Sequence, residues 1–335
     1  LTVDLGKIDT LKPEIIKVSA ENGTMQDPDD ETKIIPIQTI TFIATDKYFD
    51  TTNSLDESEI IVKINGETAE SIEKDLSIID TFKSDVNGDG IVDNAEIVGY
   101  KYQLILSDFE QIEKQTGKDF IEWSGNVLID IKENAIKDKS LNGNELTTIN
   151  GKFADFITPK VEQGTAANNI SEKTQTITFK VTDKYINSEL TSDDITVKIN
   201  GETAESVDIA NAQANKIYKD LSSTSIKYDV NRNGTVEEDE IVGYNYTLVL
   251  SNFGQTEKQT GKDFIEWSGN VSIEIAEGVI KDKGPNGDGT NPNVIAQSMT
   301  VDGKFVDFIA PKVENIEATN DPLAKTQTIT FTAID

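Results

Sequence analysis

The sequence predicts an all-β protein built from tandem antiparallel β-sandwich domains. The first observation is an alternation with period two, in which one face of an extended segment is apolar or aromatic: Val98, Tyr100, Tyr102, Leu104 and Leu106. The second is that this face returns later in the chain: Val242, Tyr244, Tyr246, Leu248 and Leu250. The third is that turns rich in Gly and Asn separate several short strand patterns within each repeat.

Internal similarity divides the chain of 335 residues into repeats. Residues 64–71 recur at 199–206, and residues 116–127 recur at 260–271. Equivalent prolines, Pro13, Pro159 and Pro311, follow the repeat boundaries. We therefore expect four parts in an excerpt of a longer array: the last strand of a preceding domain at 1–9, whole domains at 10–157 and 158–309, and the first strands of a third domain at 310–335.

The strand patterns follow one another in a regular order within each repeat. In the first repeat they are Ile37–Phe42, Glu59–Ile64, the tyrosine-rich segment, Val127–Ile131 and Leu146–Phe153. One segment of the second repeat differs, because Val207–Leu221 carries several alanines together with Ile217 and Leu221. This composition predicts a short helix there.

Residues 85–96 have the ligand spacing of a complete calcium-binding loop of the EF-hand type. Such a loop needs oxygen ligands at positions 1, 3, 5, 7, 9 and 12, with a backbone carbonyl at position 7 and a glycine at position 6 for a sharp turn. These positions are Asp85, Asn87, Asp89, Ile91, Asp93 and Glu96, with Gly90 at the turn. The spacing predicts that the loop wraps oxygens around one calcium ion.

The pattern returns at the equivalent place of the second repeat, in residues 229–240. Its ligand positions are Asp229, Asn231, Asn233, Thr235, Glu237 and Glu240, with Gly234 at the turn. An acidic surface loop without metal is the competing interpretation, and two matches at equivalent repeat positions disfavour it. The first loop offers four carboxylates and the second three, so we expect tighter binding at the first.

The sequence around the loops argues against a helix-loop-helix switch. Each loop runs directly into a period-two segment, Ile97–Ser107 or Ile241–Ser251, where an EF-hand would need an amphipathic helix. The segment before each loop differs in length between the repeats, so we expect the loop to end an insertion between two strands. Calcium is then expected to stiffen the domain rather than to switch its conformation.

Composition narrows the range of functions. The chain has 31 Lys and Arg against 60 Asp and Glu, a net charge of −29, which repels nucleic acid and anionic membranes and attracts cations. It has no cysteine, hence no disulfide or thiol chemistry, and no histidine, the commonest general base and zinc ligand. We found no apolar run of membrane-spanning length and no signal peptide. We expect no catalytic residues, no membrane insertion in this segment, and calcium and neighbouring repeats or further copies of the chain as partners.

Two other sets of residues are ambiguous in the sequence. Aspartates near the predicted domain ends either bind calcium between domains or cap turns: Asp9, Asp46, Asp155, Asp183 and Asp307. Trp123 and Trp267 occupy one repeat position, where packing on the core is favoured over a platform for sugar binding.

Short motifs at equivalent places of the repeats indicate a family. They are the junctions Ile8–Pro13, Ala154–Pro159 and Val306–Pro311, the strand ends Ala44–Asp46 and Val181–Asp183, and the late turns Ala135–Asp138 and Val279–Asp282. With these motifs the repeat resembles the bacterial immunoglobulin-like domains of large surface adhesins. The resemblance implies Ig-like sandwiches in an extracellular stalk, often stiffened by calcium. The inserted loops depart from the basic domain; dockerins carry similar loops but place them close together and follow them with helices.

The expected function is therefore that of a non-enzymatic, calcium-stabilised structural repeat of a bacterial cell-surface stalk, adhesin or extracellular fibre. Two alternatives remain open. One is a self-assembling S-layer or filament subunit, in which the domains contact copies of themselves. The other is a carbohydrate-binding accessory module of a secreted enzyme, which exposed paired aromatic residues would favour.

Overall fold

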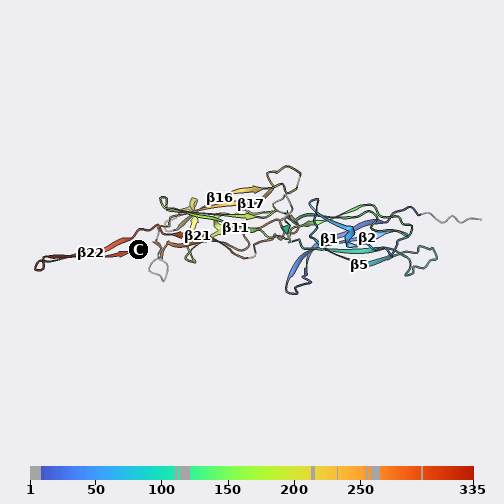
Figure 1. The fold of residues 1–335 in the computed structure, drawn as a ribbon, viewed down its shortest axis with the longest axis horizontal. Helices are drawn as coiled ribbons and strands as arrows, with labels where there is room; N and C mark the ends of the chain where they lie inside the picture. The colour runs from blue at the N-terminus through green and yellow to red at the C-terminus, as the bar shows by residue number, and fades with distance from the viewer. Residues whose placement is uncertain are drawn as a thin grey trace, which may run out of the picture.

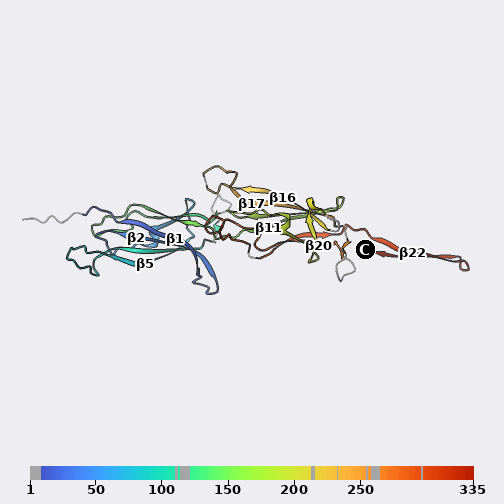
Figure 2. The same cartoon turned by 180° about the vertical axis from the view of Figure 1, so that it is seen from behind.

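A computed structural model describes residues 9–109, 112–113, 121–212, 216–231, 233–253, 256–257, 265–295 and 297–335. Two β-sandwiches follow one another along the long axis, and a β-hairpin extends beyond the second (Figures 1 and 2). The all-β prediction is confirmed. Helical elements in the described residues are 3-10 turns: η1 (Glu57–Glu59), η2 (Ser192–Asp194) and η3 (Ile209–Asn211). No helix among these residues has the length and apolar character needed to cross a membrane.

The first sandwich consists of two four-stranded antiparallel sheets. One sheet has the order β1 (Glu14–Gln26), β2 (Ile34–Thr45), β6 (Ile97–Ser107) and β5 (Glu73–Lys83). The other has the order β10 (Thr147–Ala154), β9 (Gly125–Ile131), β3 (Ile60–Ile64) and β4 (Glu67–Thr68).

The second sandwich repeats this topology. One sheet has the order β11 (Lys160–Asn169), β12 (Thr174–Thr182), β17 (Ile241–Ser251), β16 (Ile217–Lys227) and β15 (Ser206–Asp208). The other has the order β14 (Glu202–Thr203), β13 (Ile195–Ile199), β20 (Gly269–Ile275) and β21 (Met299–Val306). The added strand β15 pairs in parallel with the start of β16.

Each core lies between its two sheets, where the period-two faces meet. In the first core, Phe42 of β2 and Tyr102 of β6 are opposite one another and stack with ring centroids 5.3 Å apart. Val62 and Ile129 contribute from the other sheet. In the second core, Phe179 and Tyr246 form the same pair at 5.0 Å. Burying one such side chain stabilises the fold by about 1.5–3 kcal/mol, so the predicted tyrosine-rich strands are central to both cores.

The remaining strands are short or lie at the end of the chain. Two-residue ladders pair β7 (Ile112–Glu113) with β8 (Ile121–Glu122), and β18 (Thr256–Glu257) with β19 (Ile265–Glu266). The terminal hairpin pairs β22 (Lys312–Asp321) with β23 (Thr326–Ile334). The strand expected at residues 1–9 lies, except for Asp9, outside the described residues.

The helix predicted over Val207–Leu221 is wrong. Among the residues of this segment that the structure describes, 207–212 and 216–221, only the three residues of η3 are helical, and β16 begins at Ile217. Tertiary packing overrides the alanine-rich composition, because Ile217 is fully buried and the strand pairs with β17 from Tyr218 to Lys227.

Candidate metal centres

Loop 1, residues 85–96, is the connection of a β-hairpin. It joins β5 to β6, with Lys83 opposite Ile97, and the Ser84 N–H donates to the Glu96 carbonyl at 3.1 Å. The segment before the loop is therefore a strand of the main sheet rather than a free insertion, which corrects the sequence interpretation. The sheet holds the two ends of the loop together.

Glu96, the predicted bidentate ligand of loop 1, is 8% exposed. Its Oε1 accepts hydrogen bonds from the N–H groups of Val86 and Asn87, at 3.0 and 3.1 Å. Its Oε2 accepts from the Asp93 N–H at 3.1 Å. The carboxylate thus lies across the loop and binds amides on both of its sides.

The first half of loop 1 folds around its own side-chain oxygens. Asp85 Oδ2 accepts from the Gly90 N–H at 2.9 Å, and Gly90 has φ +82°, which a side chain would strain. Asn87 Oδ1 accepts from the Asp89 N–H and Asp89 Oδ1 from the Ile91 N–H, both at 2.8 Å. These predicted ligands face the amides of the loop.

Loop 2, residues 229–240, occupies the equivalent hairpin between β16 and β17. Glu240 is 8% exposed, and its Oε1 accepts from the N–H groups of Val230 and Asn231 at 3.1 Å each. Its Oε2 accepts from the Glu237 N–H at 2.9 Å. The position-12 carboxylate therefore has the same hydrogen bonds in both loops.

The two loops differ at position 9. In loop 2 the Nδ2 groups of Asn231 and Asn233 each donate to the Glu237 carboxylate at 3.0 Å. In loop 1 the Asp93 carboxylate accepts from the Ala95 N–H at 2.7 Å. The other loop 2 positions match loop 1: Asp229 accepts from the Gly234 N–H at 2.8 Å and Asn233 from the Thr235 N–H at 2.8 Å.

Three carboxylates come together elsewhere in the described residues, at the N-terminal end of each sandwich. The N-terminal triad is Asp9, Asp46 and Asp138, and the central triad is Asp155, Asp183 and Asp282. In each triad one oxygen of every residue lies within 4.8 Å of the others. Within the described chain, the carboxylates of loops 1 and 2 form no such group.

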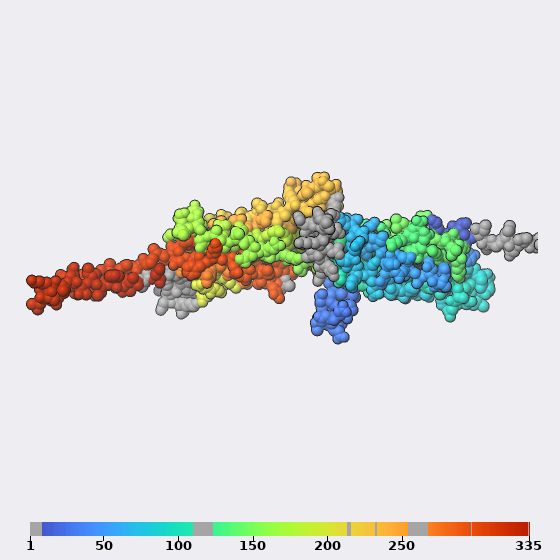
Figure 3. Space-filling view, in the orientation of Figure 1, coloured from blue at the N-terminus to red at the C-terminus, as the bar shows by residue number. Residues whose placement is uncertain are grey.

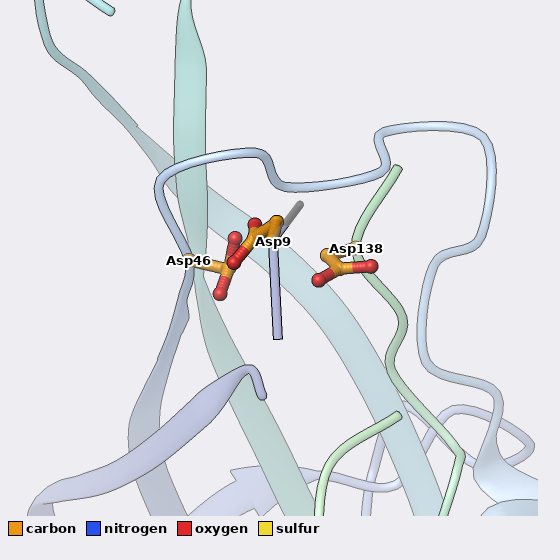
Figure 4. A group of neighbouring side chains, drawn as sticks. All are labelled: Asp9, Asp46 and Asp138. Atoms are coloured by element: carbon orange, nitrogen blue, oxygen red, sulfur yellow. The ribbon is translucent and has the colours of Figure 1, made fainter. Parts of the chain in front are cut away.

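The N-terminal triad combines three separate segments of the chain (Figure 4). Asp9 precedes β1, Asp46 follows β2, and Asp138 belongs to the late turn after β9. One oxygen of each accepts the backbone N–H two residues further along, at 3.1, 2.7 and 2.7 Å. These bonds fix the three side chains in turns that direct them toward one another.

The central triad has the same construction and is more deeply buried. Asp155 and Asp282 are fully buried, and Asp183 is 4% exposed. The corresponding turn bonds measure 3.3 Å at Asp155, 2.8 Å at Asp183 and 2.6 Å at Asp282. Asp155 lies in the linker between the sandwiches, so this triad is located at their joint.

An asparagine accompanies each triad. Asn142 Nδ2 donates to Asp138 Oδ2 at 2.6 Å and to the Asp9 carbonyl at 3.2 Å. Asn293 Nδ2 donates to Asp282 Oδ2 at 2.7 Å and to the Asp155 carbonyl at 2.8 Å. In both places the asparagine joins the late turn to the segment that precedes the sandwich.

The environment of the triads is electrostatically unfavourable for the charged form of their carboxylates when no cation is bound. Burial raises the pKa of Asp46; the Tyr48 N–H opposes this, and the neighbouring Asp9 and Asp138 raise the pKa further. Burial also raises the pKa of Asp282, although hydrogen bonds from Asn293 oppose it. A cation among the carboxylates would remove this repulsion. The donor set is oxygen only, which suits a hard cation such as Ca²⁺.

The sequence analysis identified some of the residues in the triads and missed others. The turn-capping role is confirmed, including at the exposed Asp307, whose Oδ1 accepts from the Ile309 N–H at 3.1 Å. The structure brings four of the five candidates into the triads, together with Asp138 and Asp282, which were not among the candidates. The available signal was that both occupy the same position of the repeated late-turn motif.

The paired tryptophans are part of the cores. Trp123 is 1% exposed and Trp267 is 2% exposed. Trp123 Nε1 donates to Ser71 Oγ at 2.7 Å. Neither indole face is available to stack on a sugar.

The chain was compared with models of known protein families and with curated proteins, and no match was found.

Proposed function

We propose that this chain is a non-enzymatic, calcium-stabilised structural repeat of a bacterial cell-surface stalk, adhesin or extracellular fibre. The observation that carries the proposal is the repetition of all its parts. Two sandwiches lie end to end, and each has a calcium-type loop in the same hairpin and an aspartate triad at its N-terminal end (Figure 1). The bacterial surface rests on the resemblance of the short motifs to adhesin domains.

Calcium would act at two kinds of place. In a triad it would join a linker residue, a strand end and a late turn, such as Asp155, Asp183 and Asp282. In a loop it would hold the connection between two strands of the main sheet. Because calcium binds only the folded arrangement, mass action stabilises the fold by about 2.7 kcal/mol per site at a calcium concentration about 100 times the Kd. A stalk stiffened in this way transmits force along the chain.

The carbohydrate-module alternative loses its main support, because both tryptophans are buried. The terminal hairpin extends beyond the second sandwich (Figure 3). Its Ile329 and Phe331 are 57% and 61% exposed, whereas the equivalent Ile177 and Phe179 of β12 are 0% and 2% exposed. The rest of the third domain, whose first strands are expected at 310–335, would cover this face, so the exposure does not favour the filament alternative. Light scattering of the chain over a concentration series tests it, since a constant monomer mass contradicts self-assembly.

Calorimetric titration with calcium tests the main proposal. Wild-type protein should bind calcium with a heat signal that Asp46→Asn and Glu96→Gln each reduce by one site. The matched controls are Asp50→Asn and Glu133→Gln, exchanges of acidic residues outside the triads and loops. Titration to millimolar calcium without any binding heat or thermal stabilisation would contradict the proposal.

A further inference from the structure

The late turns that carry Asp138 and Asp282 differ in length between the sandwiches. In the first, Asp138 and its partner Asn142 are separated by three residues; in the second, the segment 283–292 separates Asp282 from Asn293. Both turns begin alike, because the amides of Lys139 and Lys283 donate to the carbonyls of equivalent tyrosines, Tyr48 and Tyr185. The additional length in the second sandwich is therefore an insert at residues 284–292.

The insert contacts the first sandwich. Asn22 of β1 donates from Nδ2 to the Pro285 carbonyl at 2.8 Å. A Cβ on Gly287 would lie 2.9 Å from Cδ1 of Phe153, so the backbone of the insert lies directly against this ring. With φ +72°, Gly287 also has a backbone conformation that a side chain would strain.

The contact at Asn22 reaches the core of the first sandwich. Asn22 Oδ1 accepts from Nε2 of the fully buried Gln38 at 2.7 Å, and its Nδ2 also donates to the Phe153 carbonyl at 2.8 Å. The side chain that binds the insert is thus held in place by β2 and β10. Such a fixed donor loses little conformational entropy on docking.

Tyr185 forms the second contact across the joint. Its ring packs edge to face on Phe153, with centroids 4.8 Å apart and an interplanar angle of 71°. Its hydroxyl accepts from Asn65 Nδ2 at 2.9 Å. The adjacent Lys184 donates to the Ser124 carbonyl at 2.6 Å. Edge-to-face aromatic pairs contribute about 0.5–1.5 kcal/mol beyond their buried area.

The linker itself is short and packed. Five residues, 155–159, separate β10 from β11. Phe156 packs on Phe109 of the first sandwich with ring centroids 5.2 Å apart, and Ile157 is 7% exposed. A linker without glycine that buries its apolar residues gives little freedom to the domains that it joins.

The surface around Phe153 that Tyr185 and the insert contact has an equivalent at the C-terminal end of the second sandwich, and that equivalent surface is exposed. Phe305 is equivalent to Phe153 and is 61% exposed, whereas Phe153 is half-buried under the second sandwich. Lys47, equivalent to Lys184, is exposed, whereas Lys184 is half-buried. The burial of Phe153 and Lys184 therefore comes from the joint and not from the sandwich fold itself.

We propose that the two sandwiches dock on one another without calcium, through Tyr185 and the insert 284–292 of the second sandwich, which engage the end of the first at Asn22, Asn65 and Phe153. None of these contacts involves an acidic side chain. The joint therefore keeps its angle when calcium is removed, and the insert selects the preceding repeat as its partner. This inference is independent of the calcium-binding proposal, because the docked joint is expected whether or not the triads bind metal.

The test measures the distance between the sandwiches in the complete chain. The chain has no cysteine, so spin labels can be attached at Ser77→Cys on β5 and Thr224→Cys on β16, both exposed positions. Pulsed electron paramagnetic resonance in EDTA then reports the distribution of distances. Three variants are compared: Tyr185→Ala, its control Tyr48→Ala, and replacement of residues 284–292 by the Ser-Leu of the first sandwich's turn.

We expect a narrow distribution in EDTA for wild type and for Tyr48→Ala. Tyr185→Ala and the shortened turn should each lose the narrow distribution, and Tyr185→Phe, which keeps the ring but not the hydroxyl, should lie between. Circular dichroism identifies any variant that does not fold. A wild-type distribution that is broad in EDTA and narrows only with calcium would overturn the proposal, as would unchanged narrow distributions in both the Tyr185→Ala and the shortened-turn variants.

Discussion

The aspartate triads and the calcium-type loops arrange acidic oxygens in opposite ways. Each triad gathers carboxylates from three distant segments to within 4.8 Å of one another, and in the central triad all three are buried. Each loop is a continuous segment of twelve positions whose carboxylates bind the loop's own amides, as Glu96 does with Val86 and Asn87. A metal-free loop is therefore internally satisfied, whereas a metal-free triad retains mutual repulsion. The difference indicates that removing calcium should affect the triads more than the loops.

The largest calcium-dependent effect is expected from a substitution in the central triad. Asp183→Asn keeps the turn bond to the Tyr185 N–H but removes a charge. At calcium about 100 times the Kd, the variant should lose about 2.7 kcal/mol of calcium-dependent stabilisation, while its stability in EDTA equals or exceeds that of wild type. Thermal melts in both conditions measure this, with Asp50→Asn as the control. Equal calcium-dependent stabilisation of wild type and variant would contradict calcium binding in the central triad.

The cores provide a reference that should not depend on calcium. Burial raises the pKa of Tyr102 and of Tyr246 to about 12, although the Leu55 and Leu190 amides that donate to their hydroxyls act in the opposite direction. Unfolded tyrosine loses its proton near pH 10, so this contribution is fully present below pH 10 and is lost as the pH rises to about 12.

The expected loss is about 2–3 kcal/mol for each tyrosine. Denaturant melts between neutral pH and pH 12 measure it, with Tyr102→Phe and Tyr246→Phe reducing the alkaline loss and the exposed Tyr228→Phe as the control. The loss should be the same in calcium and in EDTA. A calcium-dependent alkaline transition would show that the cores and the metal sites are coupled, and would contradict the expectation that the cores do not depend on calcium.

The two loops should differ from one another by a smaller amount. Loop 1 has four carboxylates, Asp85, Asp89, Asp93 and Glu96, whereas loop 2 has three and uses two asparagine amides on Glu237. We expect Kd values of about 10⁻⁴–10⁻³ M. Loop 1 should bind about tenfold more tightly, a difference of about 1.4 kcal/mol. Calorimetry of Glu240→Gln and Glu96→Gln, which keep the same two triads and differ in which loop is intact, decides the order, and tighter binding in loop 2 would contradict the charge argument.

The smallest effect concerns secondary structure. Chelation should leave the strand content unchanged in circular dichroism and should expose no surface that binds an apolar dye, because β5 and β6 pair along their length outside the loop carboxylates. Proteolysis in EDTA should increase only within residues 85–96 and 229–240. A large loss of strand content or new dye binding would point to a calcium sensor instead of a stalk.

The sequence predicted what is local and missed what is brought together from a distance. Period two identified the strands Ile97–Ser107 and Ile241–Ser251 with their observed bounds, since alternation directly reports a half-buried strand. The strand β16 was assigned in part to a helix, because alanines near Ile217 obscured its alternation. Asp138 was not recognised as a site residue, because its nearness to Asp9 and Asp46 depends on how three turns meet in the folded sandwich.

The central claim, that calcium binds and stiffens this chain, is tested most directly by a crystal structure in millimolar calcium with anomalous scattering. The account predicts ions in both triads and in both loops, with oxygen ligands at about 2.3–2.6 Å. Loop 1 should coordinate through Asp85, Asn87, Asp89, the Ile91 carbonyl, Asp93 by way of water, and Glu96. Triads and loops without any anomalous density under these conditions would contradict the account.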